Sequence, residues 1–349
     1  MLRPEQIRST GAWIAAQQDP SGEIPWWRGG KMDPWDHAHA AMGLTVAGFL
    51  PEAVAAYRFL AETQGAAGGW PAGRMAGETT DATYESNHAA YFATGVWHYI
   101  CATHNMPVAR ELWPAVERAI EFTLGFQDES GAFAWAMAPS GDVWWAPLLT
   151  GSSSIHGSLV CAIRIAEHLG HPRPRWRTAA GRLANLLQSH IERFDAAGLP
   201  ETPGRYSMDW YYPVLGGALR GAQGRRRLLD RGMIDRFIAE GVGCRCVSDA
   251  PWYTVAESSE LVLALDACGL VHRAQQMLSW MRPFRMDDGG YRTGKTHPEG
   301  VFWPIESNAW TAAAVIIADD ALARRSQTSG FFRSLAGNGL VQPGRAIAF

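Results

Sequence analysis

Six copies of one pattern along the 349 residues constrain the fold of this chain more than any other feature. Each copy contains a helix, a glycine-rich turn that ends near an aromatic residue, and a second helix with a polar start. Turns of this kind include QQDPSGEIPWW, TQGAAGGWPAG and FQDESGAFAWA, which begin at residues 17, 63 and 126. Internal repeats indicate an architecture in which each repeat is one supersecondary unit that packs on its neighbours.

The helices expected from apolar periodicity form six pairs. The second helices are rich in alanine, glycine and serine, whereas first helices such as PEAVAAYRFLAETQ carry an apolar stripe and a charged face. This difference predicts an all-α fold, an (α/α)6 toroid in which the small residues crowd an inner ring around the axis. We expect helices at 5–18, 34–49, 51–64, 84–104, 109–126, 153–169, 174–193, 207–221, 226–239, 254–269, 271–281 and 304–320.

The toroid is expected to be a single domain. Residues 1–321 contain all six repeats, and no linker-like stretch divides them. Residues 322–349 lie outside the repeat pattern, and we expect this tail to pack on the rim of the ring.

Polar residues recur at the starts of the six inner helices. These starts meet at one end of the axis in a toroid, so their polar residues are expected to line one pocket. Alignment through three histidines gives a first column of Asp36, Glu85, Ser153, Asp209, Glu257 and Glu306. Three residues further on, the second column is His39, His88, His156, Tyr212, Glu260 and Ala309.

Helix capping is the simpler explanation for acids at these positions. Asp33-x-x-Asp36 and Thr254-x-x-Glu257 resemble capping boxes, and acids in a first turn suit the helix dipole. Capping does not explain polar residues one turn later, such as His39, on helices that crowd a common axis. Polar groups that converge on a concave, aromatic-lined site indicate a ligand pocket.

Several carboxyl groups in one pocket repel each other, so the pKa of some of them should rise. A protonated acid and an ionised base are the pair that glycoside hydrolysis requires. In an inverting hydrolase the two lie about 6.5–9.5 Å apart, because a water molecule enters between them. Asp33 and Asp36 share one helix turn and are too close for this pair. We expect Asp33 or Asp36 to act with Glu257 of the fifth repeat.

Tryptophan is unusually abundant, with 16 residues, many of them at expected junctions between loops and helices. A flat apolar ring with one N–H group suits a sugar ring, a terpene chain or simple packing. The aromatic candidates for substrate binding are Trp35, Tyr84, Trp145, Tyr206, Trp252, Tyr253 and Trp303. The polar candidates are His39, Glu85, His88, His156, Asp209, Glu260 and Glu306, although an isolated histidine such as His156 is more often a hydrogen-bonded core residue.

Composition argues against several other classes of protein. The net charge of -3 and the pI near 6.4 give no basis for binding nucleic acid or an anionic membrane. We expect no signal peptide and no spanning helix, since no apolar run approaches the roughly 18 residues that a span requires. Five cysteines, an odd number, are expected to be reduced and mostly buried, which fits the cytoplasm.

No cofactor or metal is expected. Asp36, His39 and His88 are conceivable ligands, but the chain has no compact metal-binding motif and no nucleotide fingerprint. The expected partner is an oligosaccharide or polysaccharide substrate, and the sequence does not indicate an oligomeric state.

The turns and the acid-bearing helices that follow them resemble two groups of α/α toroids. One group comprises terpene cyclases and prenyltransferases, and the other comprises (α/α)6 glycoside hydrolases. DPWD at 33–36 differs from the D-x-D-D motif of triterpene cyclases. Cys244 and Cys246 have no evident partners for the zinc site of a protein prenyltransferase. The glycoside hydrolases therefore fit better.

More narrowly, IPWWRGGKMDPWDHAHAAMGL and APWYTVAESSE resemble segments of the mycobacterial hydrolases of methylmannose polysaccharide. That family consists of cytosolic endo-mannosidases that act on α-1,4-linked, partly O-methylated mannose chains. The resemblance implies that Asp33, Asp36 and Glu257 are the catalytic acids and that the reaction inverts the anomeric configuration.

Two other functions remain open at this point. An isoprenoid-processing enzyme on the same toroid would require a dry aromatic pocket with few charged groups. A non-catalytic glycan-binding toroid would use the same acids only to hydrogen-bond sugar hydroxyl groups.

Overall fold

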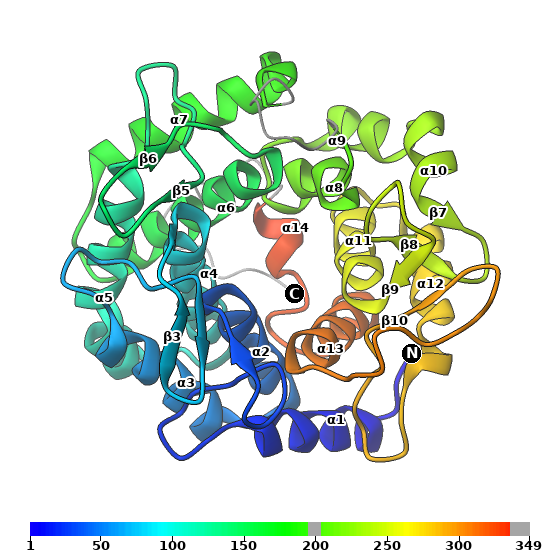
Figure 1. Ribbon diagram of the computed structural model, residues 1–349. Helices are drawn as coiled ribbons and strands as arrows, with labels where there is room; N and C mark the ends of the chain where they lie inside the picture. The colour runs from blue at the N-terminus through cyan, green and yellow to red at the C-terminus, as the bar shows by residue number, and fades with distance from the viewer. Residues whose placement is uncertain (195–203, 336–349) are drawn as a thin grey trace.

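The computed structural model describes residues 1–194 and 204–335, and within them the helix pairs close into a ring (Figure 1). Each inner helix contacts the next, and the last inner helix contacts the first. The predicted (α/α)6 toroid is therefore confirmed. The inner helices are α2 (Pro34–Ala47), α4 (Ser86–Thr103), α6 (Leu149–His168), α8 (Ser207–Leu215), α11 (Val255–Ala267) and α13 (Ala309–Ala323).

Amphipathic helices form the outer ring. In α5, for example, buried residues recur at three- and four-residue spacing, as at Val108, Leu112 and Val116. The helix expected at 226–239 is instead two helices, because Asp230 interrupts it and caps α10 by accepting the backbone N–H of Met233 at 3.0 Å. The outer helices are α1 (Pro4–Gln17), α3 (Leu50–Thr63), α5 (Met106–Leu124), α7 (Pro174–Ser189), α9 (Gly221–Leu228), α10 (Arg231–Phe237) and α12 (Val271–Trp280).

The repeated glutamines explain why the turns look alike. The side-chain amide of Gln18 donates to a carbonyl of its own turn, Gly22, and to Glu52 in the next outer helix, at 2.9 and 3.0 Å. Gln64 and Gln127 make the same two kinds of bond in the second and third turns. Each glutamine thus fastens its turn to the outer helix of the following repeat.

Small residues let the inner helices approach closely. A Cβ atom added at Gly43 of α2 would lie 2.5 Å from the Cβ of Ala313 in α13. This contact closes the ring between the first and sixth repeats.

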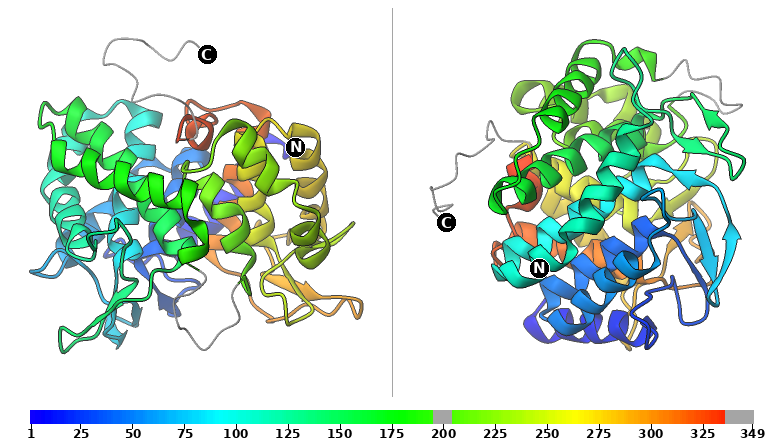
Figure 2. Two further views of the ribbon diagram at one scale, coloured as in Figure 1. Left: turned by 90° about the horizontal axis from the view of Figure 1, so that it is seen from above. Right: turned by 90° about the vertical axis from the view of Figure 1, so that its left-hand side faces the viewer.

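In the described ranges, three small antiparallel sheets lie at the end of the ring where the inner helices begin (Figures 1 and 2). Sequence periodicity did not indicate them, because each strand has only two to four residues. We call this end the mouth. The strands are β1 (Lys31–Met32), β2 (Gly73–Met75) and β3 (Glu78–Asp81) in one sheet, β4 (Tyr84–Glu85), β5 (Ala136–Met137) and β6 (Val143–Trp144) in another, and β7 (Ile238–Ala239), β8 (Gly243–Arg245), β9 (Trp252–Thr254) and β10 (Gly294–Thr296) in the third. Two short 3-10 helices, η1 (Ile191–Arg193) and η2 (Arg282–Phe284), complete the connections.

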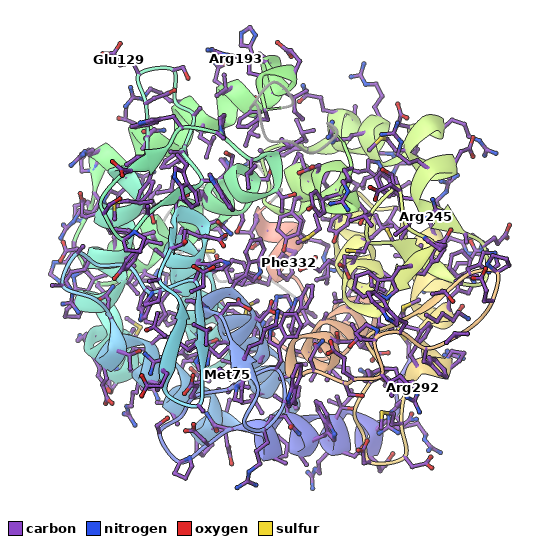
Figure 3. The ribbon with its side chains drawn as sticks, viewed as in Figure 1. Met75, Glu129, Arg193, Arg245, Arg292 and Phe332 are labelled. Atoms are coloured by element: carbon purple, nitrogen blue, oxygen red, sulfur yellow. The ribbon has the colours of Figure 1, made fainter. Side chains whose placement is uncertain are left out.

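The helix α14 (Phe331–Leu335) lies over the centre of the ring at the opposite end (Figures 1 and 2). Phe332 is buried and appears at the middle of the view along the axis (Figure 3). The buried carboxylate of Asp266 in α11 anchors this segment through Arg324 and Arg333. Residues 331–335 of the expected tail therefore lie across the bore instead of on its rim, and 336–349 lie outside the described residues.

Candidate active site

The N-caps of the inner helices show which residues are equivalent among the repeats. The residues three positions after the caps are Asp36, His88, Gly151, Asp209, Glu257 and Thr311. The expected first column is therefore right for Asp36, Asp209 and Glu257 and wrong for Glu85, Ser153 and Glu306. Glu85 is itself an N-cap, Ser153 lies deeper in α6, and Glu306 precedes its helix.

The next turn of the inner helices forms a second layer below the first. Its members, six residues after the caps, are His39, Tyr91, Ser154, Tyr212, Glu260 and Ala314. Of the expected second column, His88, His156 and Ala309 do not belong to this layer. The alignment through histidines failed because His39, His88 and His156 lie at different distances from the caps of their helices, Asp33, Glu85 and Leu148.

Asp33 and Asp36 lie side by side at the start of α2. One carboxylate oxygen of Asp33 accepts the backbone N–H of Asp36 at 2.8 Å, and the other accepts the indole N–H of Trp26 at 3.2 Å. Burial and the neighbouring Asp33 raise the pKa of the Asp36 carboxyl well above its usual range, against the opposing charge of Lys31. Asp36 therefore holds a proton under conditions in which an ordinary aspartate is ionised.

This pair lines a cavity of ≈ 430 Å³ at the mouth. The cavity combines carboxyl groups with the rings of Trp35 and Trp310 and the imidazole of His88, as expected of a pocket for a polar ligand with apolar faces. The lining residues are Lys31, Met32, Asp33, Trp35, Asp36, Ala72, Gly73, Thr80, Asp81, Glu85, His88, Met208 and Trp310.

Aromatic rings of the second layer hold Trp35 in place. Tyr91 stacks on its indole with ring centroids 5.1 Å apart, and Tyr212 meets it edge-on at 5.5 Å. The hydroxyl of Tyr91 lies 3.0 Å from Nδ1 of His39. Burial lowers the pKa of His39 to about 3, so this histidine is neutral.

Glu257 and Glu260 occupy the first and second layers of α11. Glu257 is 5% exposed, and burial together with this carboxylate raises the pKa of the Cys246 thiol beside it. Glu260 is fully buried, and its two oxygens accept the hydroxyl groups of Tyr211 and Tyr212, both at 2.8 Å. Burial, reinforced by Glu257 and opposed by the tyrosines, raises the pKa of Glu260 to about 8.

The predicted histidines and tyrosines have different surroundings. His88 lines the cavity, with Nε2 3.4 Å from a carboxylate oxygen of Glu85. His156 does not lie at the mouth: it is buried two turns inside α6, and Nδ1 is 2.7 Å from the carbonyl oxygen of Gly216. Tyr253 is also buried, and its hydroxyl accepts a hydrogen bond from Arg245.

Three other predicted residues lie around the helix starts. Asp209 accepts the backbone N–H and the hydroxyl of Thr150, at 3.1 and 2.6 Å, so it supports the start of α6. Glu306 accepts the hydroxyl of Thr293 at 3.4 Å. Tyr84, in β4, packs against Phe122.

Aromatic rings also stand on the rim of the mouth. Trp144 stacks on Trp135 with centroids 5.5 Å apart, and the adjacent Trp145 is 59% exposed. Trp252, in β9, and Trp303 meet edge-on with centroids 5.0 Å apart. The strand β9 lies across the bore from β6, which carries Trp144 (Figure 1). Tyr206, the N-cap of α8, is also partly exposed. In the sequence it lies between these two groups of aromatic residues.

Sequence reasoning missed several residues of the site. Tyr91 has the helix position of His39 and Tyr212, so alignment by caps would have found it. Trp310 lies in the first turn of α13, where its ring reaches the cavity. Lys31 lies in a short strand beside the acids and carries no sequence signal of its own.

The described residues contain no group of three or more His, Cys, Asp or Glu side chains that could hold a metal ion. In the same ranges no helix is long and apolar enough to cross a membrane. The five cysteines are all free thiols.

Comparisons with known proteins agree with this arrangement. No family model matches the chain. The MMP endo-(1,4)-3-O-methyl-alpha-D-mannosidase of Mycolicibacterium hassiacum is 46% identical over 335 residues, which cover 96% of this chain and 91% of the relative.

Solved structures share the fold at low sequence identity. A glycosidase variant superposes with a TM-score of 0.71 at 15% identity, covering 91% of this chain and 96% of that one. A D-mannose isomerase gives 0.67 at 10% identity, over 92% and 96% of the two chains. A bacterial glucoamylase bound to acarbose gives 0.67 at 12%, over 94% of this chain and 55% of the other.

The carboxyl-lined mouth and the named relative define a class of enzyme, the glycoside hydrolases built on an α/α toroid. Within that class, the chain belongs to the family of the MMP endo-(1,4)-3-O-methyl-α-D-mannosidase, as its identity over nearly the whole length shows.

Proposed function

We propose that this protein hydrolyses internal α-1,4-mannosidic links of methylmannose polysaccharide with inversion of configuration. Asp36 is the general acid and Glu257 the general base in this proposal. The observation that carries it is the raised pKa of Asp36 inside the mouth cavity, since a retained proton is what a leaving glycosidic oxygen needs. The relative from Mycolicibacterium hassiacum is named as an endo-(1,4)-3-O-methyl-alpha-D-mannosidase, which supports the same bond and sugar.

Asp33 assists Asp36 in two ways. It caps α2 and so fixes the backbone that carries Asp36. Its carboxylate, held by the indole N–H of Trp26, also keeps negative charge beside Asp36, which favours the protonated form of the acid.

Glu257 has the equivalent helix position in the fifth repeat. The helix α13 stands between α2 and α11 in the ring, so the two carboxyl groups come from separate elements. Carboxyl groups on separate helices are compatible with an inverting reaction, in which a water molecule enters between acid and base.

The remaining predicted residues divide between substrate contact and support. We assign contact with the sugars to the cavity residues Trp35, Glu85 and His88 and to the rim residues Trp145, Tyr206, Trp252 and Trp303. Tyr84 and Glu306, near the starts of their inner helices, remain predicted contacts. Their neighbours His39, His156, Asp209, Tyr253 and Glu260 are engaged in buried or helix-start contacts and support the site. The free thiols support a location in the reducing cytoplasm.

The decisive experiment is to incubate the protein with an α-1,4-linked methylmannose oligosaccharide and follow the new reducing ends by NMR. We expect shortened chains whose reducing ends are first released as β-anomers. Parallel reactions with other α-mannans and α-glucans define the substrate class. Release of α-anomers would contradict inversion. Failure to cleave any glycan, with conversion of a prenyl diphosphate, would instead identify an isoprenoid enzyme, and binding without cleavage would identify a glycan-binding toroid.

A further inference from the structure

The segment that leads into α13 exposes apolar side chains in a regular alternation. Val301, Trp303 and Ile305 are 58%, 54% and 85% exposed, whereas Phe302 and Pro304 between them are partly buried. The chain bends at residues 303–305. We call its three exposed residues the apolar stripe, since large apolar side chains this exposed are unusual so close together.

The protein holds this stripe firmly. The segment pairs with β10 through two backbone hydrogen bonds of 2.8 and 3.1 Å. Between the exposed residues, Phe302 packs against Phe284, with centroids 5.9 Å apart, and lies under the guanidinium of Arg292 at 4.5 Å. The exposed side chains are thus displayed by an anchored hairpin.

The stripe adjoins the proposed catalytic elements. The indole N–H of Trp252 donates to the carbonyl oxygen of Trp303 at 2.5 Å, and Trp252 begins the strand that leads to Glu257. Toward the C-terminus, Trp310, which lines the cavity, follows Ile305 by five residues. The stripe is thus tied to the strand before Glu257 by a hydrogen bond and to the cavity residue Trp310 by a short stretch of chain.

Exposed apolar residues gather at the mouth in general. Among the described residues, nearly all large exposed apolar side chains lie in segments that precede an inner helix. Leu229 and Met1 are the exceptions. Apolar groups gathered around one opening indicate a binding surface, because burying them in a complex is favourable.

We propose that Val301, Trp303 and Ile305 form a subsite that selects O-methylated sugar units lying outside the cavity. This inference rests on the proposed function. A methoxy group offers an apolar surface to the aliphatic side chains. A free hydroxyl at the same place would lose its hydrogen bonds to water without gaining a partner there. The indole of Trp303 supplies the flat face for the ring of the sugar.

The test measures binding by calorimetry in the background of Asp36→Asn, so that the ligand is not cleaved. The ligands are a long α-1,4-linked 3-O-methylmannose oligosaccharide and its unmethylated counterpart. Ile305→Ser is expected to weaken binding of the methylated ligand by about tenfold and of the unmethylated ligand by less than about threefold. Leu229→Ser replaces another exposed apolar side chain by serine, at the end of the outer helix α9. This control is expected to alter the affinity for neither ligand.

Trp303→Ala is expected to weaken both ligands, and the methylated one more. Equal losses for the two ligands in Ile305→Ser, or no loss, would overturn the proposed selection. A shift from dimer to monomer on ultracentrifugation, with unchanged sugar binding, would overturn it in favour of self-association. Failure of the Asp36→Asn background to bind either ligand would instead contradict the proposed function itself.

Discussion

Two acid pairs with the same three-residue spacing occupy different depths of the inner ring. Asp33 and Asp36 lie at the cap and first layer of α2 and face the cavity. Glu257 and Glu260 lie one step deeper, in the first and second layers of α11, and both are buried. The comparison teaches that depth along the helix changes the surroundings of an acid: the cap Asp33 orders backbone, Asp36 in the first layer lines the cavity, and Glu260 in the second layer is fully buried.

The largest expected effect is the loss of the general base. Glu257→Gln keeps the size of the side chain but removes the carboxylate that would activate water. We expect kcat to fall by about 10²–10⁴-fold on the methylmannose oligosaccharide. Because the leaving group is not involved, an aryl glycoside of the same oligosaccharide should show a similar loss. Wild-type turnover in this variant would remove Glu257 from the proposed mechanism.

Asp36→Asn should cause a similar loss on the natural link but a smaller one on the aryl glycoside. A good leaving group departs without the proton that Asp36 would supply, so it bypasses the missing acid. The measurement is kcat on both substrates for both variants. Asp81→Asn is the control, since it removes another carboxylate that lines the same cavity, and we expect it to keep most of the activity. A loss of the same size on the two substrates would show that Asp36 is not the proton donor.

Asp33 combines a capping role with an electrostatic one, and two substitutions separate them. Asp33→Asn keeps an oxygen that accepts the backbone N–H of Asp36 but removes the charge beside it. Asp33→Ala removes both, so it should also cost about 1 kcal/mol of stability. In both variants the pKa of Asp36 should fall, which moves the high-pH limb of the kcat/KM profile to lower pH. An unmoved limb in both variants would leave Asp33 as a cap alone.

The sequence was sufficient for the ring and for the acids that fall in a first helical turn. Asp36 and Glu257 could be found because each lies three residues after a residue type typical of helix starts. Asp33 does cap its helix, whereas the predicted cap Thr254 is wrong, because its side chain makes no hydrogen bond to the start of α11. Glu85 was misplaced because the short strand β4 precedes its helix and is invisible to periodicity. The burial of Phe332 could not be foreseen, since it depends on ion pairs of nearby arginines with Asp266, more than 50 residues away.

The smallest expected effect concerns stability and tests the deeper pair. The pKa of Glu260 is raised from 4.5 to about 8, chiefly by burial. Between these values the folded protein holds a proton that the unfolded chain has released, so the free energy of unfolding falls as pH rises through this window. Glu260→Gln carries no such proton and should lose this part of the pH dependence.

Denaturant unfolding of wild type and Glu260→Gln from pH 5 to pH 9 measures the difference. We expect the variant to gain stability relative to wild type as pH rises toward 8, with the two curves parallel above it. Tyr211→Phe is the matched comparison, because it removes one hydrogen bond that favours the ionised carboxylate and leaves Tyr212 against Trp35. It should raise the pKa of Glu260 and extend the window to higher pH. Parallel curves for Glu260→Gln over the whole range would mean that Glu260 titrates alike in both states, and the contrast between the two acid pairs would then not lie in burial.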